Sequence, residues 1–112
     1  MKNRCVMVIT SNIAARIRID DIVYIERDKR KLRIVTDGDT FEYYEKIENV
    51  EPFLDRRFFP CLKGCYINLE KVASMRDQKI TFEKGQVLYL GRENFMKTLQ
   101  YYKIYLKNMI ET

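Results

Sequence analysis

The cysteines are the side chains of this sequence with the most varied chemistry, because a thiolate can attack an electrophile, bind a metal or form a disulfide. There are three, Cys5, Cys61 and Cys65, so they cannot all pair within the chain. Cys61 and Cys65 are four positions apart, which is not the Cys-x-x-Cys spacing of zinc and thioredoxin-like sites. We therefore expect three partly buried thiols in a reducing compartment, with a redox switch at Cys61 and Cys65 as the alternative.

The absence of histidine removes much of ordinary enzyme chemistry. Without imidazole the chain has no Ser–His–Asp triad, no Cys–His zinc ligand set and no histidine general base. Carboxylates are plentiful, with 16 Asp and Glu, but none pair within a recognisable catalytic frame. The sequence therefore predicts a protein that is not an enzyme and that uses no cofactor, no metal and no small-molecule substrate.

The charged side chains are unevenly distributed along the chain. The 21 Lys and Arg exceed the 16 Asp and Glu by five, but residues 37–55 alone contain seven of the acids and only one base. The remaining segments hold 20 bases and nine acids, a net charge of +11. A basic surface of this kind suits a polyanionic partner such as nucleic acid.

The densest basic segment is residues 27–33, with five bases in seven positions at an expected hairpin tip. A charge run of this length is as often a solvated face as a binding site. Further bases fall near expected turns or strand ends: Arg56, Arg57, Lys63, Arg76, Lys84 and Arg92. Long cationic side chains on loop tips can reach phosphates across a groove, so we treat these positions as candidate contacts.

Short β-strands dominate the first four-fifths of the chain. Residues 13–19 alternate Ile or Ala with Ala or Arg, which is typical of a half-buried strand with its charges outward. Asp37-Gly38-Asp39 is a strong hairpin turn signal. Further strands are expected at residues 22–25, 32–36, 40–44, 58–59, 65–69, 72–75, 80–82 and 87–90. This spacing favours an antiparallel sandwich or barrel over βαβ units.

Two segments change to helical periodicity. Residues 46–54 predict one short helix with Pro52 in its first turn and Asn49 as a candidate N-cap. Residues 93–110 predict an amphipathic C-terminal helix whose apolar seam is Phe95, Leu99, Tyr102, Leu106 and Met109. We expect this seam to dock on the protein's own sheets, the alternative being a dimer seam.

At 112 residues the chain is long enough for one domain, which we assign to residues 1–112. The longest apolar run, residues 5–9, is far shorter than the ~20 residues of a spanning helix and too short for a signal peptide. We therefore expect a cytoplasmic protein with no membrane association.

Three ordered segments carry a family pattern. They are Ile19-Asp20-Asp21-Ile22-Val23-Tyr24-Ile25-Glu26, Phe58-Phe59-Pro60-Cys61-Leu62-Lys63-Gly64-Cys65-Tyr66-Ile67-Asn68-Leu69-Glu70-Lys71-Val72, and Gly85 with Tyr89-Leu90-Gly91-Arg92. Together they resemble the LytTR DNA-binding domain of bacterial transcriptional regulators, over about residues 13–99. Family members often carry a receiver domain or membrane helices, for which 112 residues leave no room, so we expect a stand-alone domain.

The resemblance implies a mainly β fold, an elongated antiparallel β-sheet sandwich with one short internal helix and the C-terminal helix. It also implies binding of double-stranded DNA at direct repeats, through loops inserted in successive major grooves, with a homodimer on DNA as an option. The family's DNA-reading positions match the Lys29-Arg30-Lys31 cluster, the segment Phe59 to Gly64, and Arg92. Within these we select Lys29, Arg30, Lys31, Leu62, Lys63 and Arg92, and we add Lys97 as a phosphate contact.

The departures from the family lie in the middle segment. Pro60, Leu62 and Gly64 stand where the family commonly has Arg, His and Ser, while Lys63 keeps a base. Leu62 cannot form a hydrogen bond to a base edge, although it can contact a thymine methyl group. The alternative hypothesis is therefore a protein-interaction module of the same fold with weak or no sequence-specific DNA binding. RNA binding ranks below DNA, because the aromatic-rich RRM signature is absent.

Overall fold

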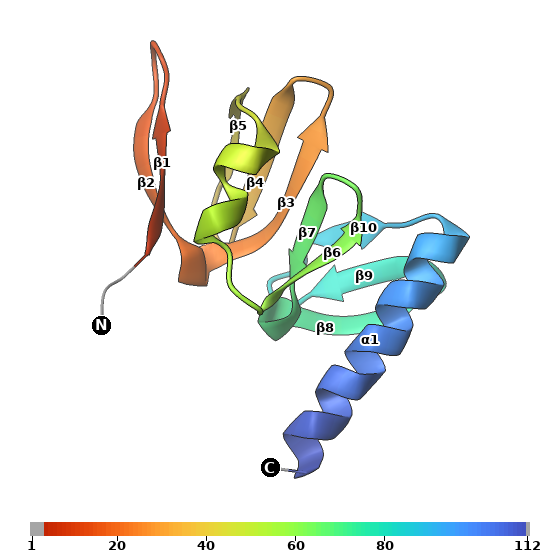
Figure 1. The fold of residues 1–112 in the computed structure, drawn as a ribbon. Coiled ribbons are helices and arrows are strands. Elements are labelled where there is room, and N and C mark those ends of the chain that lie inside the picture. The colour runs from red at the N-terminus through yellow and green to blue at the C-terminus, as the bar shows by residue number, and fades with distance from the viewer. Residues whose placement is uncertain (1–3, 112) are drawn as a thin grey trace. The chain divides into compact units, whose positions relative to one another are not determined.

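The computed structural model describes residues 4–111, which divide into two compact units, one up to Asn68 and one from Leu69 onward. The first unit is built of strands and single 3₁₀ turns, and the second contains strands, one 3₁₀ turn and the C-terminal helix (Figure 1). The mainly β, antiparallel fold expected from the sequence is confirmed. The assignment of one domain to residues 1–112 stays a prediction.

The first unit opens with a two-stranded antiparallel sheet. Strand β1 (Cys5–Ile9) pairs with β2 (Ala14–Arg18), so that Val6 lies opposite Ile17. The side chains of both these residues are buried, whereas the arginines of β2 are exposed, as the alternation over residues 13–19 predicts. One face of this hairpin therefore packs inward and the other meets solvent.

A five-stranded antiparallel sheet forms the rest of the first unit. Its strands lie in the spatial order β5-β4-β3-β7-β6. Their bounds are β3 (Ile22–Asp28), β4 (Lys31–Thr36), β5 (Thr40–Tyr44), β6 (Phe58–Leu62) and β7 (Cys65–Asn68). The 3₁₀ turn Ile19–Asp21 leads from β2 into β3. Apolar side chains from both sheets make one core, in which Val8, Ile25, Leu32 and Ile34 are fully buried.

The segment between β5 and β6 forms 3₁₀ turns. The expected short helix at residues 46–54 is present as two successive turns, Ile47–Asn49 and Glu51–Phe53, with Pro52 near the start of the second. The Asn49 cap is wrong, because Val50 precedes the second turn and the Asn49 side chain donates to Glu45 instead. A proline without an N–H and the short length favour i→i+3 turns over an α-helix.

The second unit is a three-stranded sheet with one helix. After the 3₁₀ turn Leu69–Lys71, strands β8 (Val72–Arg76), β9 (Lys79–Phe82) and β10 (Val87–Tyr89) form an antiparallel sheet in the order β10-β9-β8. Asp77 and Gln78 both have positive φ, as a tight two-residue hairpin requires. The expected turns at residues 77–78 and 84–85 are thus in place.

Helix α1 (Arg92–Glu111) confirms the expected C-terminal helix, but its apolar seam is only partly buried. Phe95 and Tyr102 are buried, and the Tyr102 hydroxyl donates to the Val72 carbonyl at 3.0 Å. Leu106 is 40% exposed and Met109 is 59% exposed. The expected docking of the seam on the protein's own sheet is therefore confirmed for Phe95 and Tyr102, whereas Leu106 and Met109 remain exposed. Among residues 4–111, no helix is long and apolar enough to cross a membrane.

Candidate nucleic-acid interface

The turn between β3 and β4 presents three consecutive bases. Lys29 and Arg30 form the turn itself, Lys31 begins β4 opposite Asp28, and the side chains of all three bases are exposed. Lys29 adopts a positive φ of 61°, a conformation that costs a residue with a Cβ roughly 1–2 kcal/mol relative to glycine. The Lys31 ammonium lies 5.4 Å from the centre of the Tyr44 ring, which holds it beside this turn. The turn therefore places a lysine in a backbone conformation that glycine would adopt with less strain.

The turn between β6 and β7 contains the second set of predicted residues. Leu62 pairs with Cys65, and Lys63 with Gly64 completes the turn. Gly64 has φ +79°, which explains why a residue without Cβ stands at the position where the family usually has Ser. Leu62 is 37% exposed and Lys63 is exposed, so an apolar and a cationic side chain lie side by side at the tip.

These two turns lie at the same end of the five-stranded sheet. Strand β7 pairs antiparallel with β3, with Cys65 opposite Glu26, so the start of β7 lies beside the end of β3. The Arg27 N–H donates to the Gly64 carbonyl oxygen at 2.8 Å, which connects one turn directly to the other. The structure thus brings the Lys29-Arg30-Lys31 cluster and the Leu62-Lys63 pair to one end of one sheet.

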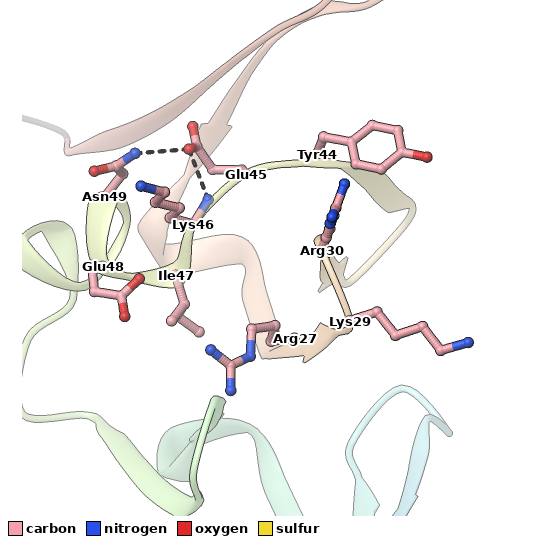
Figure 2. Close-up of a pocket in the computed structure, with 9 residues that line it drawn as sticks. All are labelled: Arg27, Lys29, Arg30, Tyr44, Glu45, Lys46, Ile47, Glu48 and Asn49. Atoms are coloured by element: carbon pink, nitrogen blue, oxygen red, sulfur yellow. Dashed lines mark hydrogen bonds between the residues drawn. The ribbon is translucent and has the colours of Figure 1, made fainter.

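A groove of about 630 Å³ lies beside the β3–β4 tip, and Figure 2 shows its lining. In this view Lys29 points away from the other labelled side chains. The groove is lined by four bases and two acids: Arg27, Lys29, Arg30, Lys46, Glu45 and Glu48. The Glu45 carboxylate accepts hydrogen bonds from the Asn49 side chain and from the Lys46 N–H, so it is partly committed to its own segment.

Arg27, Tyr44 and Lys46 were not among the site residues selected from the sequence. Tyr44 could have been found, because a hairpin closed at Asp37-Gly38-Asp39 places it opposite Lys31. Arg27 and Lys46 could not, because their positions depend on the β3–β7 pairing and on the path of the 3₁₀ turns.

Two arginines of the first unit are engaged in ion pairs. Arg33 contacts the carboxylates of Glu26 and Glu42 at 3.3 and 3.5 Å on the solvent side of the sheet. Arg57 donates to Asp55 at 2.8 Å and to Asp20 at 2.9 Å. These hydrogen bonds hold the pKa of the Asp55 carboxyl below its usual value. Both arginines are therefore engaged by carboxylates of the first unit.

The remaining two predicted residues belong to the second unit. Arg92 is the first residue of α1, and the Phe95 N–H donates to the Gly91 carbonyl just before it. Both Arg92 and Lys97 are exposed. They are five positions apart, which is about 140° around an α-helix, so they do not share a helix face. Within the described part of the chain, no cluster of three or more Cys, Asp or Glu side chains is arranged to hold a metal ion.

Comparisons with known proteins agree with this architecture. The sequence matches the family described as LytTr DNA-binding domain over residues 14–103. One similar solved structure is the LytTr DNA-binding domain of a putative methyl-accepting/DNA response regulator from Bacillus cereus. Its TM-score to this chain is 0.64 and its sequence identity is 13%, and the alignment covers 99% of this chain and 100% of that chain. None of the curated proteins compared matches the chain. The matching family is one of DNA-binding domains and not of enzymes. Since the family match covers most of its length, the chain belongs to the LytTr DNA-binding domain family.

Proposed function

We propose that this protein is a bacterial transcriptional regulator that acts in the cytoplasm and binds double-stranded DNA at direct repeats. The observation that carries the proposal is the pair of turns at one end of the five-stranded sheet, joined by the Arg27–Gly64 hydrogen bond. An end of a sheet with two protruding cationic turns has a form suited to a major groove, which is about 12 Å wide. Successive grooves would then receive loops from the protein in place of a recognition helix.

The side chains at these positions divide into two roles. Arg30 and Arg92 are proposed to contact base edges, because a guanidinium can bridge O6 and N7 of guanine. Leu62 is proposed to contact a thymine methyl group, since it is apolar and partly exposed at its turn. The lysines are proposed to contact phosphates, which position the protein without reading sequence: Lys29, Lys31, Lys63 and Lys97.

Selection from a random duplex library with the purified chain, repeated at two salt concentrations, tests this function. Enrichment of a direct repeat supports the proposal, and the selected duplex then serves to measure Kd. Arg30→Ala and Arg92→Ala are expected to weaken binding by roughly 1–3 kcal/mol and to relax specificity at one base pair each. Lys63→Ala should weaken all duplexes alike and reduce the salt slope by about one.

Arg33→Ala is the matched control, because Arg33 is already engaged by Glu26 and Glu42 on the sheet. The substitution should leave the fold intact, since exposed ion pairs contribute little to stability. Kd for the selected duplex should therefore stay within about twofold of that of the unsubstituted chain. The assignment of base contacts fails if Arg30→Ala and Arg92→Ala both behave like this control. A homodimer on DNA is part of the proposal, and sedimentation of the complex on duplexes with one and two half-sites would measure it.

A second candidate function is a protein-interaction module of the LytTr fold. It is favoured by the apolar side chains exposed on the last turns of α1, where Ile104 is 57% exposed and Ile110 is 83% exposed. Duplex selection separates the two functions, because this candidate predicts no enriched sequence at either salt concentration. Sedimentation of the free chain would show whether these turns associate with a second copy.

A further inference from the structure

The β6–β7 hairpin holds two thiols in contact. The Sγ atoms of Cys61 and Cys65 lie 3.4 Å apart, and both residues are free cysteines that are 3% exposed. Cys5, the third cysteine, is on β1 at the other end of the unit's sequence and is half-buried. The hairpin pair is therefore chemically distinct from the remaining thiol of the chain.

The contact lies at a β-bulge. Pro60 pairs with Tyr66 and Leu62 pairs with Cys65, so Cys61 is an extra residue on β6. In a bulge two residues of one strand face a single residue of the other, which re-aims their side chains. The Cys61 thiol meets Cys65 in the interior, while Leu62, the next residue along β6, points outward and is 37% exposed. A buried pair of sulfur atoms therefore lies directly beside a proposed DNA contact.

We propose that Cys61 and Cys65 are a redox-active dithiol, oxidised by small hydroperoxides to a disulfide that reshapes the turn between them. The Cys61 thiolate attacks a peroxide oxygen, the O–O bond breaks, and hydroxide leaves to give a sulfenic acid at Cys61. The Cys65 sulfur then attacks the Cys61 sulfur, the S–O bond breaks, and the departing hydroxide takes the Cys65 proton as water. Overall two thiols lose two electrons and two protons to hydrogen peroxide, which becomes two molecules of water.

The surroundings of the two thiols assign these roles. The hydrogen bond with Cys65 lowers the pKa of Cys61, which favours Cys61 as the attacking thiolate. The neighbouring Cys61 sulfur and burial raise the pKa of Cys65, as expected for the thiol that resolves the sulfenic acid. Glu26, the titratable neighbour across the β3–β7 ladder, raises both pKa values and slows the first step.

Disulfide formation requires a movement of atoms on both sides of the turn. An S–S bond is about 2.05 Å long, so the two sulfur atoms have to approach each other by more than 1 Å. The chain between them consists of Leu62, Lys63 and Gly64 only. Because two of these residues are proposed DNA contacts, the effect on DNA rests on the proposed function, whereas the thiol chemistry does not.

Peptide mapping of the peroxide-treated chain tests the chemistry. Trypsin cleaves after Lys63, between the cysteines, so the disulfide joins the peptides 58–63 and 64–71 after blocking and digestion. We expect the intact mass to fall by about 2 Da, one free thiol to remain, and dithiothreitol to reverse both changes. Cys5→Ser is the matched control and should still give the linked peptides. Glutathione disulfide, which is too bulky for thiols with 3% exposure, should react far more slowly than hydrogen peroxide.

Several results would overturn the dithiol. One is loss of the Cys5 thiol with Cys61 and Cys65 intact, and another is accumulation of sulfinic acid at Cys61 while Cys65 stays free. Cys65→Ala should abolish the linked peptides and leave Cys61 to oxidise irreversibly. A disulfide between Cys61 and Cys5 in this variant would also contradict the proposal.

The DNA effect is measured on the duplex selected with the reduced chain. Oxidation is expected to weaken binding about tenfold, with recovery in dithiothreitol and no such reversible change in Cys65→Ala. Linked peptides with an unchanged Kd would refute the effect on the turn. Linked peptides from a chain that binds no duplex when reduced would refute the proposed function and leave the dithiol established.

Discussion

Substitution of Gly64 by alanine tests the connection between the two candidate DNA-binding turns. Gly64 has φ +79°, and an added Cβ would lie 3.3 Å from the Arg27 Cβ and 3.4 Å from its Nε. The Arg27 backbone cannot easily retreat, because its N–H donates to the Gly64 carbonyl at 2.8 Å. The substitution therefore combines a strained backbone with a contact that the neighbouring strand must absorb.

The magnitude follows from these two contributions. A residue with a Cβ at such a φ costs roughly 1–2 kcal/mol. Crowding against Arg27 adds about 1–2 kcal/mol, as for other small-to-large changes at packed positions. We expect Gly64→Ala to lower the free energy of unfolding by about 2–4 kcal/mol, which moves the urea midpoint by about 1–3 M at a typical m-value.

Two other glycines separate these contributions. Gly85 has φ +98° with open space around the position of a Cβ, so Gly85→Ala should incur the backbone cost alone. Gly38 has neither a crowded Cβ position nor a positive φ in the restricted range, and Gly38→Ala should be neutral or stabilise by up to about 1 kcal/mol. Urea unfolding followed by far-ultraviolet circular dichroism measures all three. A Gly64→Ala chain as stable as Gly38→Ala would refute the reasoning.

Three further substitutions test interactions of the first unit. Arg57 lowers the pKa of the Asp55 carboxyl in the folded state. The stability from this pair is therefore present above the pKa of Asp55 in the unfolded chain and is lost as the pH falls through its lowered pKa in the folded chain. Asp55→Asn should flatten the acid limb of a pH–stability curve. The Tyr66 hydroxyl donates to Glu51 at 2.6 Å, which raises the pKa of Tyr66 to about 12. This stability is present below pH ~10 and lost as the pH rises through about 12, so Tyr66→Phe should flatten the alkaline limb. Asn68→Ala removes a buried donor to a backbone carbonyl of β3 and should cost about 1–3 kcal/mol in urea unfolding.

Each of these has a comparison that could contradict it. Glu48→Gln, at an exposed carboxyl near the same segment, should leave the acid limb unchanged, and an equal effect would remove the role given to Asp55. Tyr89→Phe, at a tyrosine that is 70% exposed, should leave the alkaline limb as it is. Asn108→Ala, on the exposed part of α1, should change stability by less than about 0.5 kcal/mol, and Asn68→Ala must exceed it clearly.

Local pattern predicted several elements because a strand with one buried face shows an alternation and a tight turn has its own residue signal. Ile17 between Arg16 and Arg18 defines β2 by alternation, and Asp37-Gly38-Asp39 defines the β4–β5 turn. Strand β1 gave no such signal, because Met7 is apolar although it points to solvent. Apolar residues on both faces remove the period of two on which the assignment depends.

The candidate site was predictable in part. The cationic tip at Lys29 and Arg30 follows from a charge run within a hairpin, and the structure keeps both residues exposed. Arg33 lies in the same run, but the β3–β4 and β4–β5 registers give it two carboxylate partners from neighbouring strands. The bulge at Cys61 depends on how β6 meets β7, and no local pattern records that pairing. The pairing register between strands therefore decides which of these side chains are engaged and which stay exposed, and local sequence patterns do not specify that register.

Pro60 has a consequence for self-association. It lies exposed on β6, one of the two outer strands of the five-stranded sheet, and it has no N–H to offer to another strand. One residue later the bulge twists the same strand out of regular pairing. An outer strand interrupted in these two ways is a poor template for strand addition, so it resists edge-to-edge aggregation. The replacement of a common family arginine by Pro60 thus removes a charge from the turn region and protects the edge of the sheet.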